Sequence, residues 1–263
     1  MAAGASTPDT VGDLGTILGV WAHPDDEAYL SAGLMASAVD AGRRVVCVTA
    51  TRGEAGFPAD DPHTAVERSA IRERELAASL AALGVREHRW LGYPDGGCPA
   101  VDDAEASGVI ASIIEEVRPD TVLTFGPDGG TGHGDHVSAC RWATLAVARL
   151  SEARPRLLYA TKAQGWGERF LAGMDPSSVM MIDGFEPETW PAEGLAVWLT
   201  CDDAMLDRKV AALRAQVSQI EPMVQAVGLD RFRAFNREEF FREPQPADAE
   251  TIARATAFSR GLR

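Results

Sequence analysis

The residues from Thr16 to Ala50, TILGVWAHPDDEAYLSAGLMASAVDAGRRVVCVTA, decide the predicted fold of the chain. Two apolar runs rich in β-branched residues, Thr16 to Trp21 and Val45 to Ala50, flank the stretch Glu27 to Ala41, whose apolar residues recur at helical spacing. This order is typical of a strand, a helix and a second strand. The sequence therefore predicts a βαβ unit near its first residues.

The same alternation continues downstream. Further helices are predicted near Thr64 to Leu83 and Glu105 to Val117, and further strands near His88 to Leu91 and Thr121 to Phe125. Gly84 and Pro119 are suitable helix stops, since glycine tolerates a left-handed backbone and the residue before proline disfavours helix. The alternation predicts an α/β fold, a Rossmann-like three-layer sandwich with a mostly parallel central sheet.

The pattern changes beyond residue 150. Short strands are expected near Leu157 to Thr161, Val179 to Ile182 and Ala196 to Thr200, followed by a strong helical pattern from Asp203 to Val227. Residues 174–193 carry proline and glycine at intervals, so they form either a lid or an irregular connector. We expect residues 1–13 to be a flexible tail, residues 14–245 a single domain, and residues 246–263 a C-terminal extension.

Composition narrows the possible partners. The 263 residues have a formal net charge of -14, which argues against nucleic acid because phosphate binding needs clustered Lys and Arg. No apolar stretch approaches the ~20 residues that span a bilayer, and residues 1–13 have no features of a secretory signal. We therefore expect a cytoplasmic protein with no membrane span that binds a small molecule, with a homo-oligomer as a possible assembly.

Two clusters of histidine and acidic residues follow predicted strands. HPDDE occupies positions 23–27, and HGDH occupies positions 133–136 after a glycine-rich loop. Three of the five histidines of the chain lie in these clusters. Ligands of open α/β sheets bind at the carboxyl ends of the strands, where the strand order reverses. We therefore expect both clusters to line one site at that edge.

The residue types of the two clusters favour a divalent metal. Zinc prefers imidazole and carboxylate ligands, and a catalytic site supplies three of them while leaving a position open. His23, Asp26 and His136 could be the ligands, while Asp25, His133 and Asp135 could supply a general base, an acid or electrophile, and an orienting partner. The same donors also accept Fe²⁺ or another divalent metal.

Two simpler interpretations compete with a metal site. Asp25, Asp26 and Glu27 could merely complement the dipole of the helix that starts there. The glycine-rich loop could cradle a phosphate, but it lacks the G-x-G-x-x-G order of a dinucleotide site. The presence of both clusters favours the metal interpretation.

Three further residues are candidates for substrate binding. Glu54 and Asp95 lie in loops that follow the second and third predicted strands, so both should lie on the rim of the site, although a solvated loop and a turn explain them too. Arg72 lies in the charged run Arg68 to Glu75, which i,i+4 ion pairs on a helix face would also explain.

The pair of motifs resembles the LmbE/PIG-L family of metal-dependent N-acetylglucosaminyl deacetylases, which includes the mycothiol-pathway deacetylases. The similarity extends over most of Val11 to Glu243, which implies one deacetylase domain over residues 14–245. Two positions depart from the pattern. Gly134 stands where the family often has proline, and Thr131 stands where the mycothiol branch has a tyrosine, so the substrate is not copied from that branch.

The resemblance implies roles for the site residues. His23, Asp26 and His136 would hold zinc, and Asp25 would deprotonate the attacking water. His133, oriented by Asp135, would stabilise the oxyanion or protonate the departing amine. Arg72 and Asp95 match positions that contact the polar head of the substrate.

These expectations define a function and its alternatives. We expect a zinc-dependent hydrolase that removes an acetyl group from an N-acetylated amino sugar or its conjugate through metal-activated water. One alternative is an amidase that acts on larger amide or thiol conjugates. Another is a non-catalytic module that binds a metal.

Overall fold

The computed structural model describes residues 14–151, 154–170 and 185–261. Within them, the central sheet has seven strands in the order β3-β2-β1-β4-β5-β9-β8. Strands β1 to β5 are parallel, and β9 is antiparallel to β5 and β8. The strands are β1 (Ile17–Trp21), β2 (Val45–Thr49), β3 (Glu87–Trp90), β4 (Thr121–Thr124), β5 (Arg156–Ala160), β8 (Val197–Thr200) and β9 (Glu238–Arg242), with β6 (Lys162–Ala163) and β7 (Thr189–Trp190) as a separate pair. The predicted α/β fold with a mostly parallel sheet is confirmed.

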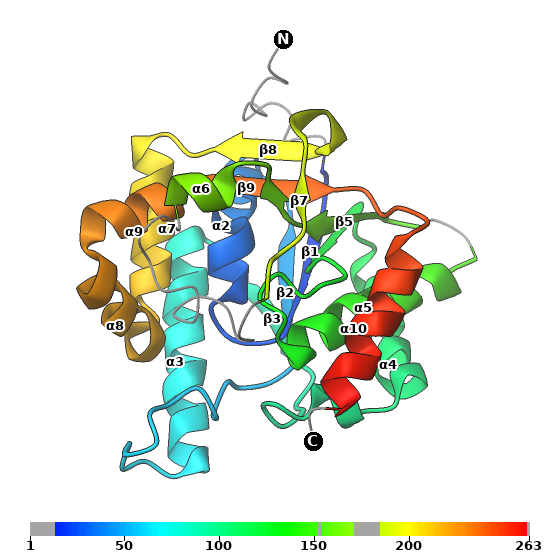
Figure 1. Ribbon diagram of the computed structural model, residues 1–263, viewed down its shortest axis with the longest axis horizontal. Helices are drawn as coiled ribbons and strands as arrows, with labels where there is room; N and C mark the ends of the chain where they lie inside the picture. Colours follow the sequence, from blue (N-terminus) through cyan, green and yellow to red (C-terminus); the bar gives the residue numbers. More distant parts are fainter. Residues whose placement is uncertain (1–13, 152–153, 171–184, 262–263) are drawn as a thin grey trace.

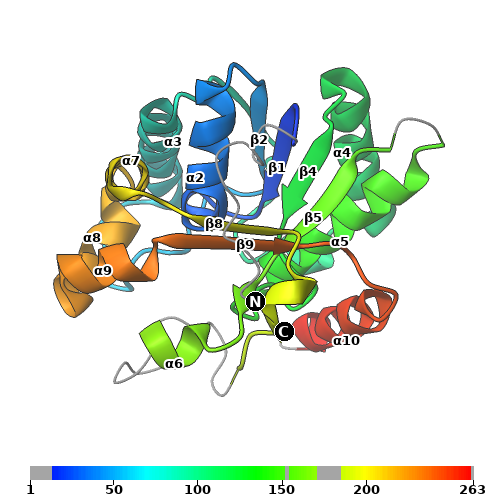
Figure 2. The same ribbon diagram turned by 90° about the horizontal axis from the view of Figure 1, so that it is seen from above.

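Helices cover both faces of the sheet (Figure 1). Figure 2 shows α2, α3 and α7 on one side, and α4, α5 and α10 on the other. The helices are α2 (Asp26–Asp40), α3 (Ala65–Leu83), α4 (Asp103–Val117), α5 (Gly134–Arg149), α6 (Trp166–Phe170), α7 (Asp203–Arg214), α8 (Val217–Val227), α9 (Leu229–Phe235) and α10 (Asp248–Gly261), with 3-10 turns at Cys98–Ala100 and Ala192–Gly194. The predicted three layers are present.

Burial and capping explain why these segments form where they do. β1, β2 and β4 are buried over their whole length, as parallel strands covered on both faces must be. The side chain of Thr64 and that of Glu67 form a reciprocal capping box at the start of α3. The helix ends at Gly84, whose φ of 78° is left-handed, so the predicted stop at this glycine is confirmed.

Strand β9 was missed by the sequence prediction, although it lies between β5 and β8. Its charged residues hide its pattern because they look like solvent-facing side chains. In the structure Glu239 and Arg242 are buried and paired, with Lys209 at 2.7 Å and with Asp248 at 2.8 Å. Internal ion pairing therefore allows a charged sequence to form a central strand.

The helical pattern predicted over Asp203 to Val227 is present, with one interruption. The segment forms two helices, α7 and α8, separated near Gln216, whose φ and ψ are -89° and 58°. The Gln216 side chain is buried, and its Nε2 donates a hydrogen bond of 3.0 Å to Glu27 Oε1. The periodicity of the segment could not reveal this buried partner, because the partner lies on α2.

Several expectations fall on parts of the chain outside the described residues. These are the tail at 1–13, the strand predicted at Val179 to Ile182, and much of the segment 174–193. Within the described residues, α10 packs on α5, where Arg141 donates to Thr256 Oγ1. The boundary at residue 245 stays a prediction.

The buried ion pair between Lys209 and Glu239 should be a major contributor to stability. Both side chains are 0% exposed, and Glu239 also accepts the backbone N–H groups of Gly33 and Leu34. Lys209→Met leaves this carboxylate without its cation, and we predict a loss of about 3–5 kcal/mol in the free energy of unfolding.

Urea unfolding would measure this loss, with Arg44→Met as the control. Arg44 pairs with Glu87 at the surface, where the side chains are 41% and 36% exposed, so that variant should lose less than about 1 kcal/mol. Equal losses in the two variants would show that the buried pair contributes no more to the free energy of unfolding than a surface pair does.

Candidate active site

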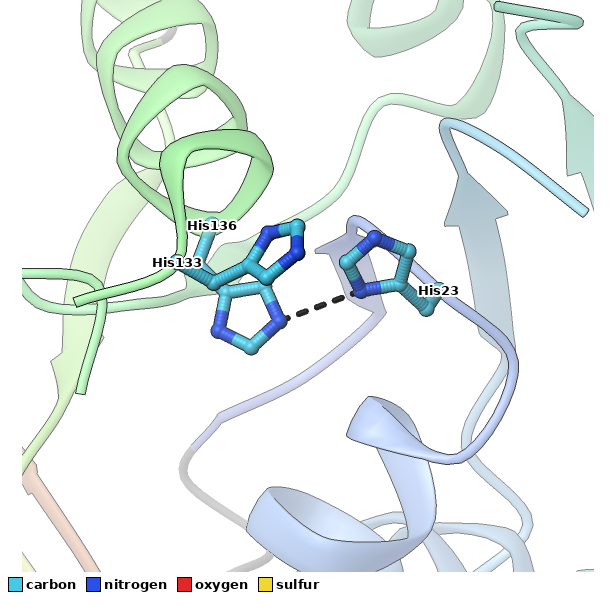
Figure 3. A group of neighbouring side chains, drawn as sticks. All are labelled: His23, His133 and His136. Carbon is cyan, nitrogen blue, oxygen red and sulfur yellow. Dashed lines mark hydrogen bonds between the residues drawn. The ribbon is translucent and has the colours of Figure 1, made fainter. Parts of the chain in front are cut away.

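The two histidine clusters meet at the carboxyl ends of β1 and β4. These strands are neighbours in the sheet, and the order of strands reverses between them. His23 follows β1 by two residues, and His133 is the N-cap of α5. Figure 3 shows His23, His133 and His136 pointing toward one another across this edge. The predicted gathering of the clusters at the strand ends is therefore found in the structure.

The rings of His23 and His136 face each other through one nitrogen each. His23 Nδ1 lies 3.1 Å from His136 Nε2 (Figure 3). The other nitrogen of His136, Nδ1, donates to the Gly129 carbonyl oxygen at 2.9 Å, which leaves the lone pair on Nε2. The other nitrogen of His23, Nε2, lies 3.1 Å from carboxylate oxygens of both Asp95 and Asp135, so it carries a hydrogen.

Such an arrangement needs a positive charge between the two facing nitrogens, because two lone pairs at this distance repel. Burial opposes a charge on His23, but the hydrogen bonds of Asp135 and Asp95 and the charge of Asp26 outweigh it and raise the pKa of His23 well above its usual value. Burial, followed by the charges of His23 and His133, holds the pKa of His136 well below its usual value. A proton can therefore occupy the gap, and so can a metal cation.

Asp26 completes the predicted ligand set. Its Oδ1 lies 3.4 Å from His136 Nε2 and its Oδ2 lies 3.7 Å from His23 Nδ1. Burial raises the pKa of Asp26 to about 7, against the opposing charge of His23. Two nitrogens bound to a tetrahedral zinc ion at about 2.0–2.1 Å lie about 3.3 Å apart, close to the spacing of the facing imidazoles. This donor set fits a zinc-like ion.

Other residues here also bring donor atoms together. One such group is His23, His133 and His136, and another is His23, Asp95 and Asp135. In the second group both carboxylates already accept hydrogen bonds from backbone N–H groups and from His23. Carboxylates that hold the far nitrogen of a ligand histidine are typical of the outer layer of a metal site.

Asp25 has an unusual backbone. It lies just before the first turn of α2, and its side chain makes no capping bond. Its φ is 108°, a conformation that costs free energy in any residue except glycine. Its N–H donates to Glu27 Oε2 at 3.0 Å, and its carboxylate accepts from Arg72 Nη2 at 3.0 Å. Two buried groups thus hold Asp25 in this conformation, and helix capping does not explain it.

His133 is oriented by backbone. Its Nδ1 accepts the N–H of Asp135 at 3.2 Å, so in the neutral ring the hydrogen is on Nε2. Burial and the charge of His23 lower the pKa of His133, which favours that neutral form. The Asp135 carboxylate instead contacts His23 and accepts the N–H groups of Gly96 and Cys98 at 2.8 and 3.1 Å.

The three residues predicted to bind substrate all lie around the site. Arg72 is 1% exposed, and its guanidinium contacts Asp25, Glu75 and the Pro24 carbonyl oxygen. Asp95 reaches His23 with one oxygen and accepts the N–H of Ala55 with the other, at 2.8 Å. Glu54 accepts the N–H of Asp95 at 3.0 Å, so it braces two loops against each other. Their contacts with a substrate stay a prediction.

The site opens into a cavity of about 530 Å³. His23, Asp25 and Asp26 line it together with apolar residues from α2, α8 and α9. Phe125, the residue after β4, stacks on His136 with ring centroids 4.2 Å apart. Sequence reasoning did not place Phe125 or the apolar residues of α8 and α9 in the site. The apolar spacing within α8 was visible in the sequence, but it reads equally well as core.

Comparisons with known proteins identify the family of the chain. A family model described as GlcNAc-PI de-N-acetylase (PIG-L) matches residues 18–148. A protein of Mycobacterium sp. (strain KMS), named 1D-myo-inositol 2-acetamido-2-deoxy-alpha-D-glucopyranoside deacetylase, is 34% identical over 228 residues, which cover 78% of this chain and 74% of that protein. A relative of the same name from Acidothermus cellulolyticus is 35% identical over 240 residues and covers 78% and 80%.

A solved structure shows the same fold. N,N'-diacetylchitobiose deacetylase from Pyrococcus horikoshii superposes with a TM-score of 0.61 at 23% identity, covering 88% of this chain and 84% of that one. The chain belongs to the PIG-L family, and it is an enzyme of the N-deacetylase class that this family defines. The resemblance seen in the paired motifs is confirmed. Among the described residues, no helix has the length and apolar character needed to cross a membrane.

Two neighbouring glycines allow the orientation of His136 to be tested. Gly129 and Gly130 have φ of 72° and 70°, so alanine is strained at both positions. An added Cβ at Gly129 would lie 3.1 Å from the Cβ of His136, whereas one at Gly130 would meet nothing within 4 Å. We predict that Gly129→Ala weakens zinc binding about 10–100-fold, because it disturbs the carbonyl that orients the ligand ring.

Competition with a chelating dye would measure both zinc affinities. Gly130→Ala is the matched control and should retain the affinity of the parent protein. If the two variants bound zinc equally well, the Gly129 carbonyl would have no part in orienting a metal ligand.

Proposed function

We propose that the protein is a zinc-dependent deacetylase that removes the acetyl group from a small N-acetylglucosamine-containing molecule. The observation that carries the proposal is the pair of imidazole nitrogens, His23 Nδ1 and His136 Nε2, facing each other beside Asp26 at the wall of a cavity. The names of the relatives, which are deacetylases of an acetamido sugar joined to inositol, support the substrate class.

His23, Asp26 and His136 are the residues that would hold the metal. When bound, a divalent ion there would polarise the amide carbonyl and lower the pKa of water at the site. Asp95 and Asp135 keep the hydrogen of His23 on Nε2, and the Gly129 carbonyl keeps that of His136 on Nδ1. Zinc fits these ligands, and Fe²⁺ is the alternative that the same donors accept.

Asp25 would carry the proton transfers, and His133 would stabilise the developing negative charge. Asp25 takes a proton from the attacking water, whose oxygen forms a bond to the acetyl carbon. The neutral His133 donates a hydrogen bond from Nε2 to the carbonyl oxygen as negative charge develops there. The C–N bond then breaks, the sugar nitrogen takes up the proton that Asp25 holds, and the products are a free amine and acetic acid, which ionises to acetate in water.

Three further residues, Arg72, Asp95 and Glu54, lie around the proposed catalytic residues. Because Arg72 bonds Asp25 while lining the cavity, it orients the base as well as facing the substrate. Asp95 lines the cavity beside His23, and Glu54 fixes the loop that carries Asp95. We assign substrate contact to Arg72 and Asp95 and a bracing role to Glu54.

The alternatives are less well supported. A binding module gains nothing from Asp25 held at a costly φ by two buried partners. An amidase for larger conjugates would use the same centre, and the cavity volume is compatible with it. Comparison of acyl groups and of conjugates separates the two hydrolases.

The proposal predicts acetate release that depends on the metal. Purified protein should release acetate from methyl N-acetylglucosaminide or an inositol conjugate, lose this activity after chelation, and regain it when zinc is added. Recovery of activity with Fe²⁺ but not with zinc would identify Fe²⁺ as the metal in place of zinc. Acetate release that survives complete metal removal, or none from any acetamido sugar, would contradict the proposed function.

Asp25→Asn separates the base from the ligands. It keeps the size of the side chain but removes its basicity, so we predict a fall in kcat of about 10²–10⁴-fold with zinc affinity retained. Asp26→Asn should instead weaken zinc binding. Asp61→Asn, in a loop where Asp61 pairs with Arg68, is the control and should change neither quantity. Full turnover in the Asp25 variant would exclude it as the base.

A further inference from the structure

The cavity has an apolar wall as well as a polar one. Six apolar or aromatic side chains supply it, and we call them the apolar wall: Tyr29, Leu30, Met223, Val227, Phe232 and Phe235. They come from α2, α8 and α9, segments far apart in the sequence. None of the catalytic roles proposed above uses them.

These side chains are not simply core. Phe232 is buried, but the other five members of the apolar wall are only half-buried, and all six line the cavity. Apolar surface facing a cavity gains free energy when an apolar group covers it. Ligand pockets typically combine such surface with a few polar groups that fix orientation.

The apolar wall is continuous with the reacting centre. Tyr29 lies one helical turn after Asp25, and its N–H donates to the Asp25 carbonyl oxygen at 2.9 Å. At the other side, Arg72 contacts Asp25 and also Ser218, in the first turn of α8, at 3.4 Å. A group attached to a sugar held at His23 and Asp26 can therefore reach the apolar wall.

The size of the cavity allows both parts to bind together. Its volume of about 530 Å³ lies within the range of roughly 300–1,000 Å³ that holds drug-sized ligands. The lining includes Met223 and Phe235 as well as the polar residues around His23, so the cavity can hold a substrate larger than the sugar alone.

We propose that the apolar wall is a subsite for an alkyl or aryl group carried by the substrate. The inference rests on the proposed deacetylase function and deepens it, because it assigns the substrate class as an acetamido sugar with an apolar substituent. Either the group at the anomeric carbon or the acyl chain could present that apolar surface.

Kinetics with matched substrates test the subsite. Hexyl and methyl glycosides of N-acetylglucosamine vary the anomeric group, and N-hexanoyl and N-acetyl forms of the methyl glycoside vary the acyl chain. Each fully buried methylene is worth up to about fourfold in binding. In one of the two pairs, we expect the substrate with the longer chain to exceed the shorter one at least tenfold in kcat/KM, mainly through a lower KM. The pair that shows this preference identifies whether the anomeric group or the acyl chain occupies the subsite.

Two variants on the same helix supply the control. Met223→Gln makes the apolar wall polar at nearly constant size and should reduce the ratio of long to short substrate to near one. Val217→Gln changes a residue that is 58% exposed and should leave that ratio and the basal activity as they are. Equal loss of the ratio in both variants would overturn the assignment to the apolar wall.

Calorimetry keeps the inference separate from the proposed function. Hexyl glucoside has no acetamide, so its binding reports the subsite whether or not acetate is released. Tighter binding than methyl glucoside, with a negative heat-capacity change that Met223→Gln diminishes, supports the subsite even if no sugar is deacetylated. If acetate is released but neither substrate pair shows a preference for the longer chain, the subsite is overturned and the proposed deacetylase function is not. A preference for anionic substituents would have the same meaning.

Discussion

The close approach of His23 Nδ1 and His136 Nε2, at 3.1 Å, is the contact on which the rest of the site depends. Two imidazoles stay in this position only if a cation or a proton lies between them and if their far nitrogens are fixed. The sheet supplies the first condition for the approach, because β1 and β4 are neighbours at the point where strand order reverses. The outer layer supplies the second, through the carboxylate of Asp135 and the carbonyl of Gly129. The sheet and the outer hydrogen bonds thus together fix the positions of the His23 and His136 ring nitrogens.

A second constraint ties the helical layer to the chemistry. Asp25 keeps its positive φ because Glu27 accepts its N–H and Arg72 binds its carboxylate. Glu27 is also the partner of Gln216, at the break between α7 and α8. The break therefore turns α8 so that it starts beside Arg72 and continues along the cavity. The proposed base and the proposed apolar subsite share one set of buried polar contacts, which explains why a helix that could have run straight does not.

The central features of the fold and site follow from local pattern, whereas the errors come from contacts distant in sequence. The βαβ unit is predictable because continuous apolar runs in its strands and a period of 3.6 residues in its helix reflect burial directly. β9 escapes because the charges of Glu239 and Arg242 are cancelled by partners on α7 and α10. The break between α7 and α8 is not visible in the sequence, because Gln216 gains its hydrogen-bond partner on α2. The Asp135 carboxylate lies against His23 and not His133, since sequence spacing says which residues are near but not which atoms face each other. The apolar wall was visible as periodicity, but only the tertiary structure shows that it lines a cavity.

The most direct test of the metal centre is an anomalous-difference map, collected at the zinc edge from crystals of the protein grown with zinc. The account predicts one strong peak within about 2.0–2.2 Å of His23 Nδ1, His136 Nε2 and an Asp26 oxygen, open toward the cavity on its remaining side. A peak held by His23 with Asp95 and Asp135, a peak with His133 in place of Asp26, or no peak at this edge of the sheet would contradict it.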